Sequence, residues 1–416
     1  MTDTRREFLK QIGFAGAGLV SLAAAPPLFL QRAAFADAKK PKKKDDGRIL
    51  VVVQMAGGND GLNTVVPYGD SEYYKARPSL GIAKGSVLKL DDHLGLHPAM
   101  TGFKELYDED MLSVIQGVGY KNPNRSHFRS MDIWQSARPD TEYTDDGWLG
   151  RALDVTAEKY QGGVPALAFG MDKLPLSLVA AKVNVPTIRN LDSYQLQLGP
   201  GPESNKKLHR RLIDKLANQS ATVGTDLDFL RKTTVTAFTS ADRLKKVASS
   251  YKPSVPYPNN RLSQQLKVLA QIIAGDFGTR IFFVTLGGFD THSEQQGAHQ
   301  GLLAELSSAL RAFYMDLKGH KLHEQVLIAT FSEFGRRVKE NGSLGTDHGA
   351  ASQLFVVGAK GKAGIHGKHP SLTSLFQGDL KFHTDFRQVY ATLLDNWLGV
   401  PSEKVLGQKF AKLDFV

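Results

Sequence analysis

Short apolar runs that end in glycine or a polar turn recur along the chain and alternate with stretches of helical period. Buried strands are predicted at 48–55, 111–117, 164–170, 280–286, 326–331 and 353–358. Helices are predicted at 70–76, 129–136, 146–160, 261–274, 302–317 and 385–398. Strands that alternate with helices of about a dozen residues are typical of βαβ units, so we predict an α/β fold built on a parallel sheet.

Aspartate and histidine residues gather where these predicted strands end. Asp60 follows the first strand, Asp290 and His292 follow the strand at 280–286, and Asp347-His348 closes the loop after 326–331. Ligands of parallel sheets bind beyond the carboxyl ends of the strands, and carboxylates with imidazoles suit a divalent metal ion. Any one of these residues is equally explained as a polar loop residue, but the set predicts a metal-dependent hydrolase site.

A strand, a polar loop and a helix that begins near Ser126 form a second candidate feature. This arrangement presents a hydroxyl beside the N–H groups and positive dipole end of a helix, where an anion is stabilised. Ser126 is therefore either the N-cap of the helix or a nucleophile. His127 is a candidate base, a contact for phosphate, or a buried polar group.

The N-terminus has the pattern of an export signal. Thr4–Lys10 resembles the twin-arginine signal, an apolar region follows to Leu30, and small residues around Ala36 and Ala38 offer cleavage sites. We predict a signal peptide at 1–38, the twin-arginine translocase as partner during export, and a periplasmic or secreted bacterial protein. The alternative is a membrane anchor, but the prolines at 26 and 27 favour cleavage. The chain has no cysteine, which suits an oxidising destination.

The charge is positive but does not indicate nucleic-acid binding. The formal net charge is +10, and removal of residues 1–38 leaves +9. Much of it lies in the predicted basic linker at 39–47, and no folded element interleaves basic with aromatic residues. After the signal, no apolar run approaches the roughly 18 residues of a membrane span, so we predict no stable span in the mature protein.

The strand pattern is interrupted once. From about 186 to 258, charged helical segments replace strands and the stretch ends in a proline-rich sequence. We predict a helical insertion over the sheet within one domain at 48–416.

Eight motifs along the chain resemble those of the DUF1501 family, which is grouped with the alkaline phosphatase-like and sulfatase-like superfamily. They are TRREFLK, MAGGNDGLN, SHF, GWLGR, GGFDTH, FSEFGR, GTDHG and DFRQVYATLLDNWLG. The resemblance implies a three-layer α/β/α sandwich around a mostly parallel central sheet. It also implies two divalent ions about 4 Å apart, which flank a Ser or Thr nucleophile.

The metal ligands expected from this resemblance are Asp60, Asp290, His292, Asp347, His348 and His366. Ser126 is then the nucleophile, and Arg125 or His127 holds the non-bridging oxygens of the substrate. His369 and Glu333 are the alternatives to His366 as the ligand that completes the site.

These observations predict an exported hydrolase of small anionic phosphate or sulfate esters that uses two divalent ions, with Zn, Mn and Ca all open. A formylglycine sulfatase is disfavoured, because there is no cysteine and Ser126 lacks the following Pro and Arg. The spacing of Asp290 and His292 is tighter than is usual in the superfamily. It supports the alternative of a non-catalytic extracytoplasmic binding protein on the same fold.

Overall fold

The computed structural model describes residues 47–159, 164–189, 247, 249–358 and 362–416. The predicted signal peptide, nearly all of the predicted basic linker and most of the predicted helical insertion lie outside the described residues. Within them, no helix is long and apolar enough to cross a membrane.

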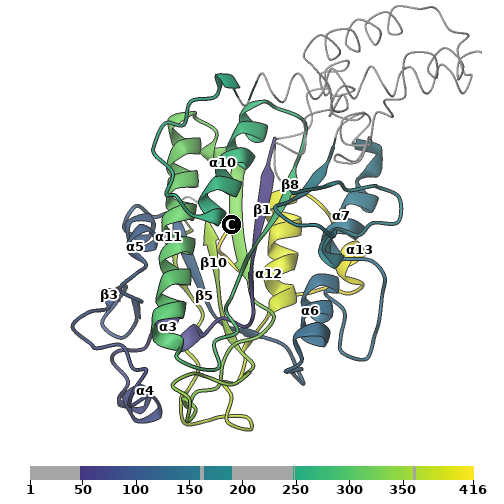
Figure 1. Ribbon diagram of the computed structural model, residues 1–416. Helices are drawn as coiled ribbons and strands as arrows, with labels where there is room; N and C mark the ends of the chain where they lie inside the picture. The colour runs from purple at the N-terminus through teal and green to yellow at the C-terminus, as the bar shows by residue number, and fades with distance from the viewer. Residues whose placement is uncertain (1–46, 160–163, 190–246, 248, 359–361) are drawn as a thin grey trace, which may run out of the picture.

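A nine-stranded sheet forms the centre of the described part of the chain (Figure 1). Its strands are β1 (Ile49–Ala56), β5 (Leu112–Gly119), β6 (Ala166–Phe169), β7 (Thr187–Ile188), β8 (Ile281–Gly287), β9 (Val326–Phe331), β10 (Ser352–Val357), β11 (Gly364–His366) and β12 (Thr384–Asp385). The order is β11-β5-β10-β9-β1-β8-β6-β7, and β12 pairs with β5. Only β10 runs antiparallel to its neighbours β9 and β5, so the sheet is mostly parallel, as predicted.

The central strand β1 is apolar on both faces because helices cover both. Val51 and Val53 belong to one buried cluster, and Leu50 and Val52 belong to another on the opposite face. Successive side chains of a strand point to opposite faces, so a nearly continuous apolar run is what a doubly covered strand requires.

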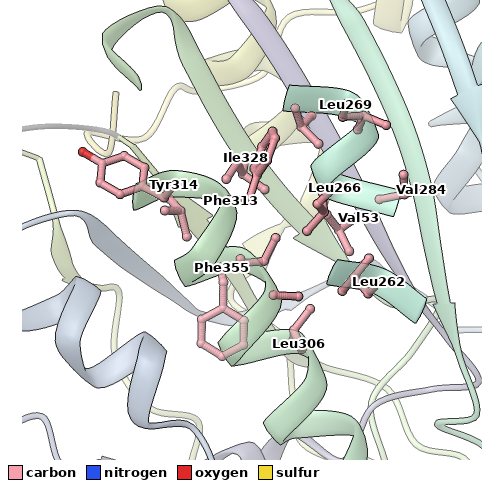
Figure 2. Packing of buried hydrophobic residues seen from close by; sticks show 14 of the residues in the cluster. Val53, Leu262, Leu266, Leu269, Val284, Leu306, Phe313, Tyr314, Ile328 and Phe355 are labelled. Atoms are coloured by element: carbon pink, nitrogen blue, oxygen red, sulfur yellow. The ribbon is translucent and has the colours of Figure 1, made fainter. Parts of the chain in front are cut away.

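Two helical layers enclose the sheet, which completes the predicted three-layer α/β/α sandwich (Figure 1). One layer holds α5 (Thr101–Asp108), α10 (Arg261–Ala274) and α11 (Gln295–Gly319). The other holds α6 (His127–Ser136), α7 (Trp148–Val155), α12 (Phe386–Thr392) and α13 (Ser402–Leu406). Figure 2 shows how Leu266 and Phe313 of the first layer pack against Val53 and Ile328 of the sheet. Truncation of Phe313 to alanine there costs about 3–5 kcal/mol.

The remaining elements are short. They are α3 (Gly61–Thr64), α4 (Ser71–Ala76), a small sheet of β2 (Val65–Val66), β3 (Leu88–Lys89) and β4 (Gly95–Leu96), the 3₁₀ turns Ala157–Lys159, Leu176–Leu178 and His323–Gln325, and a π-helical turn at Leu393–Leu398. The π turn continues α12 and ends at Gly399, whose φ of 63° is left-handed, as expected for a glycine that terminates a helix.

Candidate metal centre

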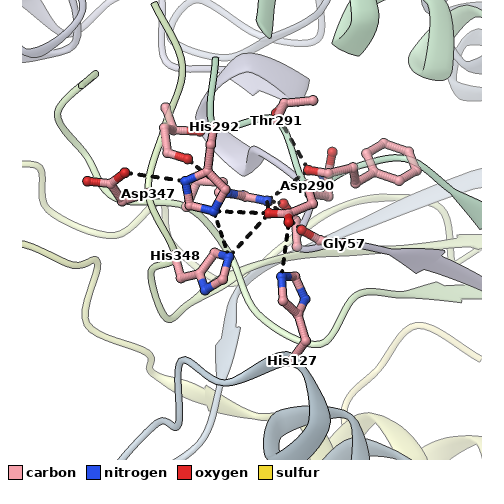
Figure 3. A network of polar contacts seen from close by, with 12 residues as sticks. Gly57, His127, Asp290, Thr291, His292, Asp347 and His348 are labelled. Carbon is pink, nitrogen blue, oxygen red and sulfur yellow. Dashed lines mark hydrogen bonds and ion pairs between the residues drawn. The ribbon is translucent and has the colours of Figure 1, made fainter. Parts of the chain in front are cut away.

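The loops after β1, β8 and β9 meet beyond the carboxyl ends of these three adjacent strands. Gly57 makes a close approach between two of them. Its φ is +122°, and a Cβ at this position would lie 2.4 Å from the backbone nitrogen of Asp290. Because only glycine fits here, the loop after β1 packs directly against the loop after β8. Figure 3 shows the polar side chains that gather at this point.

Asp290 is the shared partner of the polar cluster (Figure 3). Its Oδ1 lies 2.7 Å from Nη2 of Arg336, 3.1 Å from Nε2 of His292 and 3.2 Å from Nε2 of His348. Its Oδ2 lies 3.3 Å from Nε2 of His127. One carboxylate therefore faces a guanidinium and three imidazole rings.

The carboxyl group of Asp290 is held in its ionised form. Partial burial raises its pKa, but the hydrogen bond and the positive charge of the Arg336 guanidinium outweigh burial and bring the pKa down to about 2. Asp290 is therefore anionic near neutral pH, which is the form that binds a metal ion.

His348 and His127 are each anchored through Nδ1. Nδ1 of His348 lies 2.8 Å from the carbonyl oxygen of Arg125, and Nδ1 of His127 lies 3.0 Å from Oε1 of the buried Glu333. A carbonyl and a carboxylate only accept hydrogen bonds, so we assign the proton of both neutral rings to Nδ1. This leaves the lone pair on Nε2, and metal-binding histidines in proteins are usually fixed in this way.

His292 completes the row of imidazoles. Its Nε2 lies 2.9 Å from Nε2 of His348, and its Nδ1 lies 3.4 Å from Oδ1 of Asp347. Asn341 donates to both Oδ1 of Asp347 and the carbonyl oxygen of His292, which ties these two residues together. Gly345 packs so closely that a Cβ there would lie 2.2 Å from the carbonyl carbon of His292.

This donor set fits a divalent ion. Ligand atoms from His127, Asp290 and His348 all lie within 4.8 Å of one another. With both rings protonated at Nδ1, two Nε2 lone pairs face the oxygens of an anionic Asp290, which is unfavourable unless a cation lies between them. Nε2 of His127 is buried and has no hydrogen-bond partner among the described residues, as expected for an atom that is free to bind an ion. Two imidazoles and a carboxylate with open positions are typical of a transition-metal site.

Asp60, by contrast, lies in a separate buried ion pair. Its Oδ2 accepts from Nη1 of Arg77, with both side chains fully buried, and from Nε2 of Gln295 at 2.5 Å. Burial raises the pKa of Asp60, but the Arg77 guanidinium outweighs it, so the pKa stays below the ordinary value of 3.8. The structure therefore does not bring Asp60 together with Asp290 and the histidines.

His366 also lies away from the cluster. It belongs to the edge strand β11, pairs in register with Ile115 in the middle of β5, and donates from Nε2 to the carbonyl oxygen of Lys362. His369, its alternative, is largely buried with its ring against His93, and burial lowers its pKa to about 4. Neither residue reaches the loops that carry Asp290 and His348.

Ser126 and Arg125 lie beside His127 at the start of α6. Ser126 is the N-cap residue and is exposed, but its hydroxyl makes no capping hydrogen bond. The guanidinium of Arg125 is held by the buried Asp379, with Nε at 2.9 Å and Nη2 at 2.5 Å from Oδ2. Its side chain is therefore already paired, and its carbonyl oxygen is the group that fixes His348.

Two important residues have roles that the sequence did not reveal. Arg336 is fully buried, and its guanidinium donates to the carbonyl oxygens of Gly57, Gly58, Phe289 and Thr346 as well as to Asp290. Glu333 was considered as a ligand, but it anchors His127 instead. The FSEFGR motif marks both positions, yet nothing in its spacing indicates which loops the arginine joins.

The fold and the site together define a class of protein. It is an α/β sandwich with a cluster of histidine and aspartate residues beyond the carboxyl ends of its strands. The chain belongs to the family described as "Protein of unknown function (DUF1501)", whose model matches residues 48–408. This confirms the family resemblance drawn from the sequence motifs. No curated protein matches the chain.

Several solved structures are similar to this chain. The PsFucS1 sulfatase from Pseudoalteromonas sp. has a TM-score of 0.39 and 12% identity over 96% of this chain and 78% of its own. The alkaline phosphatase from the Antarctic bacterium TAB5 has a TM-score of 0.31 and 13% identity over 78% of this chain and 95% of its own. The C-terminal periplasmic domain of EcEptC from Escherichia coli, in complex with Zn, has a TM-score of 0.35 and 9% identity over 76% and 75%. At these TM-scores the similarities carry no argument about activity.

Proposed function

We propose that this protein is an exported, metal-dependent hydrolase of phosphate or sulfate esters. The observation that carries the proposal is the meeting of His127, Asp290 and His348 within 4.8 Å, with both histidines anchored through Nδ1. A nitrogen-rich donor set favours Zn²⁺ or a similar transition-metal ion over Ca²⁺, which prefers oxygen ligands. When bound, such an ion supplies Lewis-acid polarisation of an ester oxygen.

Ser126 is the proposed nucleophile. Its hydroxyl is exposed, makes no capping hydrogen bond and stands at the N-terminus of the ten-residue helix α6, directly before the ligand His127. The N–H groups of the first helical turn stabilise an anionic group at this end of the helix. They replace Arg125 as the contact for the non-bridging oxygens, because the Arg125 guanidinium is paired with Asp379.

We propose that His292 accepts and donates a proton during the reaction. Its Nε2 lies at the cluster, while Asp347 orients the ring through Nδ1 at 3.4 Å and compensates its charge when Nε2 carries a proton. Both side chains are about half exposed, so a substrate can reach them. The twin-arginine pattern at Thr4–Lys10 supports export to the periplasm or beyond.

Hydrolysis by the Ser126→Ala variant tests the proposal. Aryl phosphate monoesters, aryl phosphate diesters and aryl sulfates are the probes, with Ser86→Ala, another exposed serine, as the matched control. Loss of the nucleophile lowers kcat by roughly a thousand-fold or more with metal content unchanged. Full activity of Ser126→Ala would refute the role of this hydroxyl. A wild-type protein that binds metal but hydrolyses no ester would favour the non-catalytic binding protein instead.

A further inference from the structure

Arg336 places a permanent positive charge against the ligand Asp290. Its side chain is fully buried, and Nη2 lies 2.7 Å from Oδ1 of Asp290. Nε and Nη1 donate to the carbonyl oxygens of Gly58 and Thr346, at 2.7 and 2.8 Å. A guanidinium with its donors used on three loops at once is fixed in place and keeps its charge at any physiological pH.

The Arg336 guanidinium lies at the carboxylate oxygen that a second ion would need as a ligand. Ions of a two-metal site lie about 3.5–4 Å apart and share or divide the same carboxylates. Oδ1 of Asp290 already accepts a hydrogen bond from Arg336, while Oδ2 lies on the side of His127. A second divalent ion at Oδ1 would meet a buried cation that has no room to withdraw.

Asp60, the other carboxylate expected to bind metal, is neutralised in the same manner. Its partner is Arg77, which is equally buried and donates from Nε to the carbonyl oxygen of Val338. Gln295 takes a further position on Oδ2 of Asp60. A guanidinium thus stands at each of the two carboxylates that follow β1 and β8.

The donors that remain do not make a second set. Among the described residues, one group of three metal-binding side chains lies close enough to share an ion, and it is His127, Asp290 and His348. His292 and Asp347 lie beside it and are both about half exposed, while the carboxylate of Glu333 is used on Nδ1 of His127. The residues therefore do not fit the pair of ions that the family resemblance implies.

We infer that the centre holds a single divalent ion and that the Arg336 guanidinium is the second positive charge of the site. The inference rests on the proposed metal centre and specifies its composition. In this arrangement, Arg336 occupies Oδ1 of Asp290 and leaves Oδ2 to the ion. His292 and Asp347 remain free for the substrate.

Metal stoichiometry tests this inference without any assay of activity. Mature protein stripped of metal is titrated with Zn²⁺ by calorimetry, and a parallel sample is loaded with Mn²⁺ for electron paramagnetic resonance. We expect one ion per chain and the resolved hyperfine pattern of an isolated Mn²⁺. Two ions per chain with an exchange-coupled Mn²⁺ pair would overturn the inference and leave the metal centre standing. No binding at all would overturn the proposed metal centre, and this inference with it.

The Asp347→Asn variant provides a second test that distinguishes a one-ion centre from a two-ion centre. The side chain is 53% exposed, so the substitution leaves the core untouched. If the ion is held by His127, Asp290 and His348, the variant still binds one ion per chain. A fall from two ions to one would show that Asp347 holds a second ion. Asp154→Asn is the matched control, because this carboxylate near the end of α7 accepts from the backbone N–H groups of Ala181 and Lys182.

Discussion

Replacing Asp60 with asparagine removes one charge from a fully buried ion pair and leaves Arg77 without its counter-charge. Both side chains have no exposed surface, so solvent cannot screen the remaining guanidinium. Breaking such a pair on one side costs about 3–5 kcal/mol, which lowers the folding equilibrium constant by roughly two to four powers of ten. Metal binding should be unaffected, since Asp60 lies outside the cluster of His127, Asp290 and His348.

The effect of pH follows from the same ion pair. Arg77 keeps the pKa of Asp60 below 3.8 in spite of burial, so the pair stabilises the fold above that pH. This stabilisation is lost as the pH falls from 3.8 through the lower pKa of the folded state. The difference in stability between wild type and Asp60→Asn should therefore shrink in acid.

Urea unfolding followed by tryptophan fluorescence measures the loss, and elemental analysis of the same samples measures bound metal. The double variant Asp60→Asn/Arg77→Met should be less destabilised than the sum of the two single changes, because no buried charge is left unpaired. Asp290→Asn is the contrasting control, which should lose metal. An Asp60→Asn protein that keeps wild-type stability but loses its metal would refute the ion-pair reasoning and make Asp60 a ligand.

Two further predictions concern the anchoring of the ligands and the ion itself. Glu333→Gln weakens the hold on Nδ1 of His127 and should lower metal affinity about 10–100-fold, as measured by competition with a chelating dye. The control Glu340→Gln changes a carboxylate that accepts from the backbone N–H groups of Ser79 and Leu80, and it should bind metal as wild type does. Equal affinities in both variants would contradict the role of Glu333. Chelation should lower the thermal midpoint, and return of the ion at about 100 times its Kd should restore about 2.7 kcal/mol. An unchanged midpoint would mean that the ion does not bind the folded protein selectively.

Much of the fold could be predicted because strands and helices leave local patterns. The predicted strand 326–331 and helix 261–274 match β9 and α10 at both ends, and the leucine stripe lies within α11. The direction of β10 could not be predicted, since an apolar run does not indicate whether a strand lies parallel or antiparallel to its neighbours. Helix α5 has only three buried residues in eight, and the sequence pattern did not reveal it.

The candidate site could be predicted only in part, for a similar reason. Asp290, His292 and His348 could be predicted to lie near one another because they lie in loops that follow predicted strands, and parallel strands bring their carboxyl ends to one edge. Asp60 also follows a strand, but its partner Arg77 comes from the separate helix end at α4, and no spacing rule reveals such a pair.

The sequence could not show that His366 lies apart from the cluster, because chain order does not give depth in the sheet. It pairs with the middle of β5 on an edge strand, far along the sheet order from β1 and β8. His127 was identified as functional, yet its place beside Asp290 depends on how α6 packs on the sheet.

The most direct test of the metal centre is the metal content of mature protein from the exported pool, measured by elemental mass spectrometry. The variants are His348→Ala, which removes a proposed ligand, and His366→Ala, which removes a histidine outside the cluster. The structure predicts a single transition-metal ion per chain in wild type and in His366→Ala, and its loss in His348→Ala. Metal retained in His348→Ala, or lost in His366→Ala, would contradict the assignment of the centre.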